Sequence, residues 1–481
     1  NRCAYVCPHA VIRPVALTAE EAANAPEGMK TLDLTGMKEY KFTMSVSALD
    51  CTGCGSCVNV CPGKKGAKAL AMENLEASAD EQKYFDYTVK LPVKEDVIAK
   101  FKEATVKGSQ FKQPLLEFSG ACAGCGETPY AKLITQLFGD RMYIANATGC
   151  SSIWGNSSPS TPYTVNAKGQ GPAWSNSLFE DNAEFGYGML LAQRAIRDGL
   201  KAKVEDVVAN GTNEDVKAAG QEWLDTFAVG ATNGAATDKL VAALEACGCD
   251  KAKEILAQKD FLAKKSQWIF GGDGWAYDIG FGGVDHVLAS GRDINVMVFD
   301  TEVYSNTGGQ SSKSTPTGAI AQFAAGGKET KKKDMASIAM SYGYVYVAQI
   351  SMGADFNQTV KAIAEAEAYP GPSLIIAYAP CINHGIKKGM AKAQTEEELA
   401  VKVGYWHNFR FNPAAEGNKF SLDSKAPSME DYQAFLDGEV RYNSLKRQNP
   451  EKAARLFAKN EAEAKARFEY LQKLIALHSA E

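Results

Sequence analysis

The feature that most constrains this chain is the spacing of its cysteines. Of the twelve cysteines among 481 residues, four fall in the run 51–62, with the spacing C-x2-C-x2-C-x3-C-P. Two-residue gaps let successive thiolates surround one face of a 4Fe–4S cube, while the fourth cysteine of such a run ligates a neighbouring cube. Structural zinc sites instead use paired C-x2-C knuckles, and disulfide frameworks belong to small secreted chains. The run therefore predicts iron–sulfur ligation by Cys51, Cys54, Cys57 and Cys61, with zinc or structural cysteines as the alternative.

The first residues contain the end of a second run of this kind. Cys3 and Cys7 have the spacing C-x3-C-P. The crossed pairing of two-cluster ferredoxins then predicts that Cys7 completes the cluster of Cys51, Cys54 and Cys57. Cys61 would join Cys3 and two cysteines located before residue 1. The chain also begins without methionine, so we expect a fragment of a longer protein whose ferredoxin-like module is truncated in its first cluster motif.

The remaining cysteines are less regular. Cys122, Cys125, Cys150 and Cys381 lie in Gly-rich or Pro-rich loops, two of them after expected strands. Their setting suits one more cube assembled from distant segments, but zinc or a redox dithiol is equally compatible with the spacing. Cys247 and Cys249 lie in a stretch rich in Ala, Leu, Lys and Glu, and we interpret them as ordinary cysteines at a helix end.

A second informative stretch predicts a phosphate and magnesium site. Residues 267–270 read as a buried strand, followed by a Gly-Asp-Gly turn, a helix from about 276 and another strand at 294–299. This is a βαβ unit of a parallel sheet, and ligands bind at the carboxyl ends of such strands. Gly272 and Gly274 would let the backbone approach a diphosphate. Asp273 and Thr301 would supply oxygen ligands for Mg²⁺.

Here the sequence resembles known proteins. The Gly-Asp-Gly loop with a downstream polar ligand is similar to the thiamine diphosphate fold. The segments 171–186 and 300–310, the ferredoxin runs and the four scattered cysteines resemble the pyruvate:ferredoxin (flavodoxin) oxidoreductase family. The resemblance covers essentially the whole chain and matches the carboxy-terminal part of the single-chain enzyme.

The resemblance implies oxidative decarboxylation of pyruvate with coenzyme A to acetyl-CoA and CO₂, in anaerobic metabolism. Electrons would pass one at a time through three 4Fe–4S clusters to ferredoxin or flavodoxin, and the enzyme would be a homodimer. It also implies that the pyrimidine-activating and coenzyme A-binding domains belong to the missing N-terminal portion. We therefore expect residues 1–481 alone not to turn over pyruvate.

The resemblance also assigns roles to individual residues. A cube beside the thiamine would be held by Cys122, Cys125, Cys150 and Cys381. Mg²⁺ would be bound by Asp273, Thr301 and the carbonyl of Val303, and Asn306 would face the reacting carbon. The cofactor would further contact Glu127, Cys150, Gly272, Gly274, Trp275, Glu302, Tyr304 and Ser305. By sequence alone, Glu127 is more simply an acidic residue at a helix N-terminus. His384 is either a hydrogen-bonding neighbour of the Cys381 cluster or a structural loop residue.

These elements predict an α/β fold built on a doubly wound parallel sheet. The expected organisation is a ferredoxin-like α+β module at 1–75, a connector at 76–115, a thiamine domain at 116–410 and a mostly helical extension at 411–481. The thiamine domain would carry a helical insertion at about 200–265. Further elements expected in these last two parts are strands at 344–348 and 373–378 and helices at 357–368 and 451–477. The last helix would dock on the body through Leu456, Phe457, Phe468, Leu471 and Leu474.

Charge and hydropathy exclude other classes of protein. Lys plus Arg total 52 against 57 Asp plus Glu, a net charge of −5, which leaves no basic excess for nucleic acid. No apolar run is long enough to span a membrane, and no signal peptide is visible, so we expect a cytoplasmic protein. Lys331–Lys333 is predicted to be a solvated loop rather than a dock for an acidic ferredoxin. The rival functions are oxidation of another 2-oxoacid, an electron-transfer module without thiamine, and a zinc-stabilised scaffold.

Overall fold

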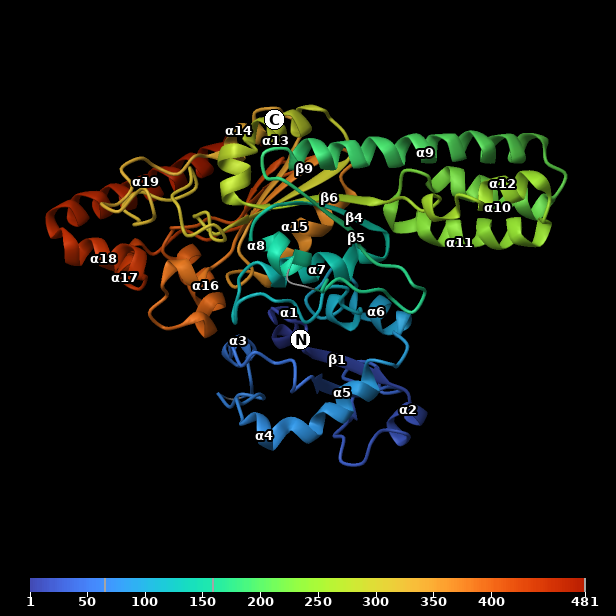
Figure 1. Cartoon of the computed structure of the whole chain (residues 1–481), viewed down its shortest axis with the longest axis horizontal. Coiled ribbons are helices and arrows are strands. Elements are labelled where there is room, and N and C mark those ends of the chain that lie inside the picture. Colours follow the sequence, from blue (N-terminus) through green and yellow to red (C-terminus); the bar gives the residue numbers. More distant parts are fainter. Residues whose placement is uncertain (65, 158–159, 480–481) are drawn as a thin grey trace.

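The structure, a computed structural model, describes residues 1–64, 66–157 and 160–479. A central sheet lies between three attached regions (Figure 1): the first part of the chain below it, a green helical arm to the right and red C-terminal helices to the left. In the described part of the chain, the large sheet has eight strands in the order β11-β10-β8-β9-β7-β6-β4-β5. Their bounds are β4 Met142–Ala147, β5 Ala173–Ser177, β6 Ser266–Gly272, β7 Ile294–Asp300, β8 Tyr346–Ile350, β9 Pro372–Tyr378, β10 Phe409–Phe411 and β11 Phe420–Leu422.

Strands β4 to β9 pair in parallel, which confirms the predicted sheet. All residues of β7 and β9 are buried. Near-continuous runs of Val, Ile, Leu and Phe are typical of parallel strands covered on both faces, because neither face meets water. The strands at 294–299 and 373–378 were predicted almost to the residue, whereas β8 begins two residues later than the predicted 344–348.

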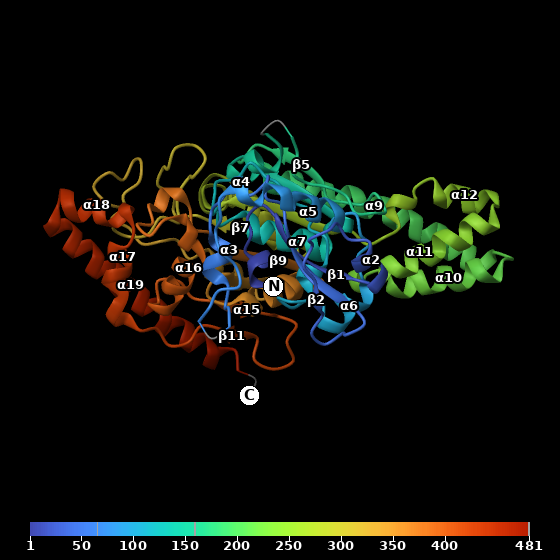
Figure 2. The same ribbon diagram turned by 90° about the horizontal axis from the view of Figure 1, so that it is seen from below.

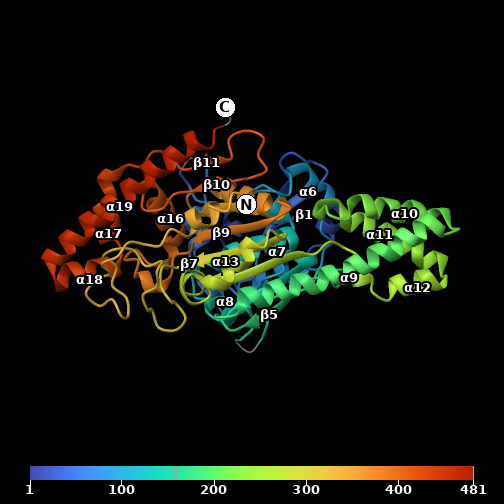
Figure 3. The same cartoon turned by 90° about the horizontal axis from the view of Figure 1, so that it is seen from above.

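Helices cover both faces of this sheet. One face packs against α7 (Thr128–Phe138) and α15 (Phe356–Ala368) through apolar residues such as Leu133 and Ile363. The other face is covered by α13 (Phe281–Ala289), α14 (Met335–Met340) and the start of α9. Figure 3 shows α13 and α9 on this face from above. Two short irregular elements follow strands β4 and β6: α8 (Cys150–Ser152) and the π-helical turn η6 (Gly274–Ile279), respectively.

The helical arm consists of α9 (Asn182–Asn210), α10 (Glu214–Thr226), α11 (Gly230–Cys247) and α12 (Asp250–Leu256). It has an apolar core of its own around the buried Trp223, which packs against Leu200, Leu240 and Leu262. Helices therefore occupy most of the predicted insertion at 200–265. However, α9 already begins at Asn182, because its first turns pack on the sheet before the helix extends outward.

The first part of the chain forms a second, smaller sheet. In the described residues it has the order β1-β3-β2, all antiparallel, with β1 Ile12–Leu17, β2 Leu32–Asp33 and β3 Lys41–Val46. Short helices lie around this sheet: α1 Arg2–Tyr5, α2 Ala19–Ala23, α3 Ser56–Val60, α4 Leu75–Ser78, α5 Gln82–Thr88 and α6 Glu95–Phe101. Figure 2 shows α2 to α6 from below. Val97 and Ile98 of α6 share a core with Ala16 and Leu34. The segment predicted as a connector, 76–115, is thus packed onto this small sheet.

The C-terminal part holds α16 (Ala393–Lys402), α17 (Tyr432–Asp437), α18 (Val440–Gln448) and α19 (Pro450–Leu477). Leu456, Phe457, Leu471 and Leu474 of α19 are buried against the main core, as predicted, and Phe468 is half-buried beside His407. The extension from residue 411 was predicted to be mostly helical, and no strand was expected around its start. It instead adds β10 and β11 antiparallel to the sheet, where Phe409, Phe411 and Phe420 point into the core.

Among the residues that the structure describes, none of the helices combines the length and apolar character that a membrane-spanning segment needs.

Candidate active site at the carboxyl edge of the sheet

The predicted site residues follow four strands that are neighbours in the sheet. Cys150 comes after β4, Asp273 after β6, Thr301 after β7 and Cys381 after β9. Because these strands are parallel, their carboxyl ends lie at one edge, where ligands of such sheets bind. The sheet therefore brings together residues that are up to 231 positions apart in the sequence, from Cys150 to Cys381.

Three oxygen atoms meet at the predicted magnesium position. The Thr301 hydroxyl lies 3.0 Å from Asp273 Oδ1 and 3.0 Å from the Val303 carbonyl oxygen. A hydroxyl has one proton, so it can donate to only one of these two acceptors at a time. Adjacent oxygens of an octahedral Mg²⁺ shell, with bonds of 2.0–2.1 Å, are separated by about 3 Å. The arrangement of these three oxygens fits a bound cation, which would attract all of them.

The buried carboxyl group of Asp273 also favours a bound cation. Its side chain is fully buried, and burial followed by the nearby Asp300 carboxylate raises its pKa well above the usual range. Ser312 donates to Asp273 Oδ2 over 2.6 Å, and the Thr301 N–H donates to Oδ1. Lys332 pairs with Asp300 over 2.8 Å, rather than with Asp273. A divalent cation would favour the ionised form of Asp273 by supplying the missing positive charge.

A small cavity opens beside these oxygens. Nine of the predicted cofactor contacts line it: Glu127, Cys150, Gly272, Gly274, Trp275, Val303, Tyr304, Ser305 and Asn306. The other lining residues are Thr148, Gly149, Ser151, Phe179 and Thr307. A Cβ on Gly272 would meet only one heavy atom of the described residues, the Phe299 carbonyl oxygen at 3.9 Å, so this backbone is open to a ligand. A Cβ on Gly274 would lie 2.4 Å from the Tyr304 ring. Gly274 thus makes room for that aromatic side chain.

Glu302 behaves differently from its neighbours. Its backbone has a positive φ of 60°, and its buried carboxylate turns away from the cavity to pair with Arg441 and Lys332. Its N–H donates to Asp300, and its carbonyl accepts from Thr315. All its polar groups are therefore used inside the protein, and its predicted contact with the cofactor has no support in this geometry.

The residues that hold Glu302 were missed by sequence reasoning. Lys332 was predicted to be solvated, but it bridges Asp300 and Glu302 over 2.8 and 2.9 Å, and that prediction was wrong. Arg441 joins Glu302 to Glu439 over 2.8 and 2.7 Å. No local pattern could have revealed the pairs of Glu302 with Lys332 and Arg441, since each joins segments that are distant in sequence. Asp300 was the member of this ion-pair network that the sequence could most easily have indicated, because it directly precedes the predicted ligand Thr301.

The four scattered cysteines meet above the same edge, and we call them the edge cysteine set: Cys122, Cys125, Cys150 and Cys381. The Gly126 N–H donates to the Pro380 carbonyl over 3.1 Å, which ties the loop of Cys125 to the loop of Cys381. A Cβ on Gly126 would lie 2.6 Å from the Pro380 nitrogen, so only glycine allows this approach. Cys150 joins from α8, where its sulfur lies 3.2 Å from the Ser305 hydroxyl.

Burial makes free thiolates in the edge cysteine set unfavourable, so the deprotonated sulfurs would need a positive charge beside them. Burial raises the pKa of Cys125 and Cys150 well above the usual value and that of Cys381 to about 11, and neighbouring members of the set add to each shift. Iron would stabilise the deprotonated sulfurs. Among the described residues, no three His, Cys, Asp or Glu side chains converge as ligands of one ion. A cube spreads its four thiolates around four irons, so it does not require such convergence.

Glu127 lies between the cavity and the edge cysteine set. Its buried carboxylate accepts a hydrogen bond from Trp154 Nε1 over 2.7 Å, and burial raises its pKa to about 7. The residue directly precedes α7, as expected for an acid at a helix N-terminus. Glu127 therefore lies both at a helix N-terminus and beside the cavity, the two positions that the sequence analysis considered.

The cysteines of the first region form two neighbouring groups. Helices α1 and α3 pack together, which places Cys3 and Cys7 beside the run from Cys51 to Cys61. Burial raises the pKa of Cys57 to about 12, with Cys7 and Cys54 as the next contributors. The pKa of Cys3 is raised mainly by burial and, to a smaller extent, by Cys61. These proximities agree with the crossed pairing that the spacing predicts.

Two remaining predictions concern residues away from the ligands. His384 is buried, and its Nε2 lies 2.7 Å from the Thr301 carbonyl, so it must donate there. Burial lowers its pKa to about 3, which leaves the ring neutral. It supports the magnesium loop and does not contact the Cys381 sulfur. Cys247 ends α11 and Cys249 precedes α12, at the helix end that was expected.

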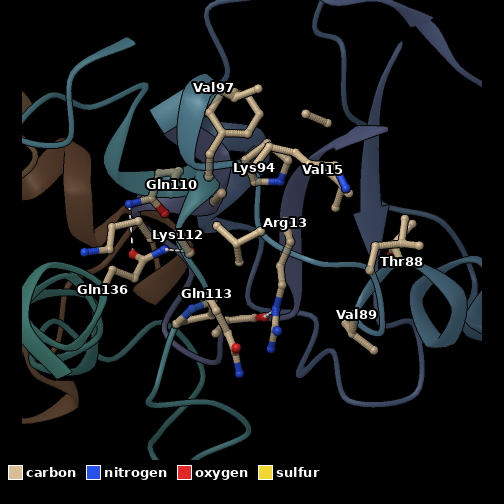
Figure 4. Close-up of a pocket in the computed structure, with 18 of the residues that line it drawn as sticks. Arg13, Val15, Thr88, Val89, Lys94, Val97, Gln110, Lys112, Gln113 and Gln136 are labelled. Atoms are coloured by element: carbon tan, nitrogen blue, oxygen red, sulfur yellow. Dashed lines mark hydrogen bonds between the residues drawn. The ribbon is translucent and has the colours of Figure 1, made fainter. Parts of the chain in front are cut away.

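Figure 4 shows a different cavity, between the small sheet and α7. Arg13 and Val15 of β1 face Gln110, Lys112 and Gln136 across it, and Gln110 donates to Gln136 over 2.9 Å. Its lining includes the buried Lys132, which donates to the Ala4 carbonyl beside Cys3. This cavity lies outside the sheet edge and belongs to the packing of the first region on the main sheet.

Comparisons with known proteins agree with this geometry. A family described as "Thiamine pyrophosphate enzyme, C-terminal TPP binding domain" matches residues 228–377, and a "4Fe-4S dicluster domain" matches residues 1–65. The pyruvate-flavodoxin oxidoreductase of Enterobacter agglomerans is 58% identical over 98% of this chain and 41% of its own length. The pyruvate:ferredoxin oxidoreductase of Moorella thermoacetica is 57% identical over the same shares. Over 98% of its length, the chain is homologous to members of the pyruvate:ferredoxin (flavodoxin) oxidoreductase family.

The match has a defined extent. The chain spans about two fifths of the length of these two relatives. The mitochondrial NADP-dependent pyruvate dehydrogenase of Euglena gracilis is 48% identical over 99% of this chain and 26% of its own length. A solved 2-oxoglutarate:ferredoxin oxidoreductase from Magnetococcus marinus covers 55% of this chain and 65% of its own, with 15% identity and a TM-score of 0.32, which is too low to support an argument. The two family matches show that the chain carries a 4Fe–4S region and a thiamine diphosphate-binding region.

Proposed function

We propose that this chain forms the thiamine-binding and electron-transfer part of an enzyme that oxidises pyruvate with coenzyme A to acetyl-CoA and CO₂. The observation that carries the proposal is the meeting of two sites at one sheet edge. Val303, whose carbonyl meets the Thr301 hydroxyl beside Asp273, and Cys150 of the edge cysteine set both line the same cavity. When bound, thiamine diphosphate supplies an electron sink for loss of CO₂, and a 4Fe–4S cluster accepts single electrons.

The residues of this chain would have separate tasks. Asp273, Thr301 and the Val303 carbonyl would hold Mg²⁺ and through it the diphosphate. Gly272 would leave space for the phosphates, and Asn306, which is exposed at the cavity, would meet the reacting part of the substrate. Glu127 and Trp154 would close the inner wall. Burial of this wall excludes water from the region where charge develops.

The path for electrons is supported by a shared segment between two cysteine groups. The segment Met390–Ala391 lies against Gly124 on one side and Gly55 on the other. Gly124 stands between Cys122 and Cys125, and Gly55 between Cys54 and Cys57. Asn59 of α3 donates to the Ala391 carbonyl over 2.8 Å. A cluster held by each group would therefore face the other across two residues, as a relay requires.

The finer features of the proposal extend this arrangement. Three 4Fe–4S clusters would line up from the cavity to the surface of the small-sheet region, the outermost held by Cys3 and Cys61 with further ligands. Ferredoxin or flavodoxin would accept the electrons there, in the cytoplasm. Pyruvate and coenzyme A would be bound together with parts of the relatives that this chain does not match, and the enzyme would be a homodimer.

The test is the composition and activity of the anaerobically purified holoenzyme. We expect about twelve irons per chain, bound thiamine diphosphate and coenzyme A-dependent reduction of ferredoxin by pyruvate but not by 2-oxoglutarate. Preference for 2-oxoglutarate would transfer the activity to another 2-oxoacid. Iron without thiamine would leave an electron-transfer module, and a colourless zinc protein would exclude both.

A further inference from the structure

The loop of Cys381 and the loop of Ser305 are joined by side-chain hydrogen bonds. Asn383 Nδ2 lies 3.3 Å from the Ser305 carbonyl oxygen and 3.6 Å from the Cys381 sulfur. The Ser305 hydroxyl lies 3.2 Å from the Cys150 sulfur. Ser305 and Asn383 thus contact each other and one sulfur each of the edge cysteine set.

The chemistry of the sulfurs fixes the direction of donation. A metal-bound thiolate has no proton and can only accept, so the Ser305 hydroxyl must donate to Cys150. The Asn383 amide has two N–H groups, and it can serve the Ser305 carbonyl and the Cys381 sulfur together. Among the described residues, Ser305 and Asn383 supply the side-chain hydrogen bonds to these four sulfurs. The Glu127 backbone N–H, 3.4 Å from Cys125, is a third donor.

We propose that Ser305 and Asn383 are positioning residues that set the reduction potential of the cluster bound by the edge cysteine set. The inference rests on the proposed function, because it needs that cluster to be present. Uptake of one electron adds one negative charge to the cluster, and donors aimed at its sulfurs stabilise the added charge. Removing either donor should therefore make the cluster harder to reduce.

Ser305 lies on the same loop as the predicted cofactor ligands. It lies between Val303 and Asn306, on the segment predicted to bind Mg²⁺ and to face the substrate. The same short loop thus positions the cofactor and one donor to the cluster. His384, which sequence reasoning considered for this role, instead donates to Thr301, and Asn383 takes the contact with the sulfur.

The experiment is a redox titration of the anaerobic holoenzyme, reduced stepwise with dithionite and followed by electron paramagnetic resonance. The variants are Ser305→Ala, which removes the hydroxyl, and Asn383→Leu, which removes the amide at similar size. Ser305→Thr keeps the hydroxyl and is the matched control. The clusters of the Cys51–Cys61 run in the same sample are the internal reference, because neither substitution touches them.

We expect each donor-removing variant to lower the ratio of reduced to oxidised edge cluster two- to tenfold at a fixed potential. This corresponds to roughly 20 to 60 mV, at about 59 mV per tenfold for one electron. Ser305→Thr should titrate like the unaltered protein. If Ser305→Ala loses the cluster, retention in Ser305→Thr supports donation by the hydroxyl, and loss in both overturns it.

An unchanged potential in both donor-removing variants with full iron content would overturn the inference and leave the proposed function standing. Absence of the edge cluster from the unaltered holoenzyme would instead overturn the proposed function.

Discussion

The two cysteine-rich regions of this protein are built in opposite ways. In the first region, Cys51, Cys54, Cys57 and Cys61 lie within one short stretch, and only Cys3 and Cys7 must be added by packing α1 against α3. The edge cysteine set is drawn from three separate loops: those of Cys150 and Cys381 follow parallel strands that end at one edge, and that of Cys122 and Cys125 is tied to the Cys381 loop through Gly126. The first arrangement is encoded by spacing and the second by the sheet. A substitution that disturbs the meeting of these loops should therefore remove the cluster of the edge cysteine set and leave the clusters of the first region in place.

The largest effect is expected from Asp273→Asn. The amide has no negative charge for the cation, so binding of thiamine diphosphate should be lost and pyruvate oxidation by the holoenzyme should fall on the order of 100-fold or more. Iron should stay bound in both regions, because Asp273 touches none of the cysteines. Thiamine and iron assays on the same sample check this. Full retention of thiamine would refute the magnesium assignment.

Gly126→Ala separates the two regions most directly. The added Cβ would lie 2.6 Å from the Pro380 nitrogen, and such overpacking costs about 1–3 kcal/mol or more. The loops of Cys125 and Cys381 should move apart, and the edge cluster should be lost while the clusters of the first region remain. Iron content and electron paramagnetic resonance report the outcome.

The matched control for this change is Gly53→Ala. Gly53 lies inside the local run, has a φ of 69°, and a Cβ there would meet no heavy atom of the described residues within 4 Å. The substitution should cost about 1–2 kcal/mol through the left-handed backbone and retain every cluster. Equal cluster loss in the two variants would contradict the comparison between local and assembled sites.

Glu127→Gln should change the pH dependence of stability of the cluster-free chain. The folded pKa of Glu127 is about 7 against a usual 4.5, so the folded state binds more protons than the unfolded state between these values. The free energy of unfolding must then fall as pH rises through this window, by about 3 kcal/mol at most. The glutamine variant lacks this loss, so the two proteins should have similar stability near pH 4 and diverge towards pH 8. Denaturant unfolding at both pH values measures it, and parallel pH profiles would show that Glu127 does not titrate there.

The smallest effect is expected from replacing both Cys247 and Cys249 by serine. The two sulfurs lie 2.9 Å apart at the tip of the helical arm, where Cys249 is exposed and Cys247 half-buried. We expect a change in unfolding free energy below about 0.5 kcal/mol and no loss of iron. Loss of iron in this variant would show that cysteines outside both regions also serve as ligands.

The elements that the sequence predicted best were those with a strong local signal. The strands at 294–299 and 373–378 are continuous apolar runs, and the helix at 451–477 has one apolar face. The short strands β10 and β11 were not expected, because three-residue strands carry too little pattern to distinguish from a loop. Lys332 was misjudged for a related reason. Its neighbours Lys331 and Lys333 suggested a solvated run, while its partners Asp300 and Glu302 lie thirty or more residues away.

The sequence by itself determined the chemistry: the cysteine run with its cluster spacing, the Gly-Asp-Gly turn and the longer strands and helices around it. These properties depend on neighbours within a few residues, where backbone geometry leaves few choices. Only the tertiary structure decided which groups share a site. It joined Cys125 to Cys381 through Gly126, turned Glu302 away from the cavity and placed Asn383, rather than His384, against a sulfur. Such choices follow from the packing of segments far apart in the chain, where the energy of burying a charge or of fitting a backbone is set by partners that no local pattern specifies.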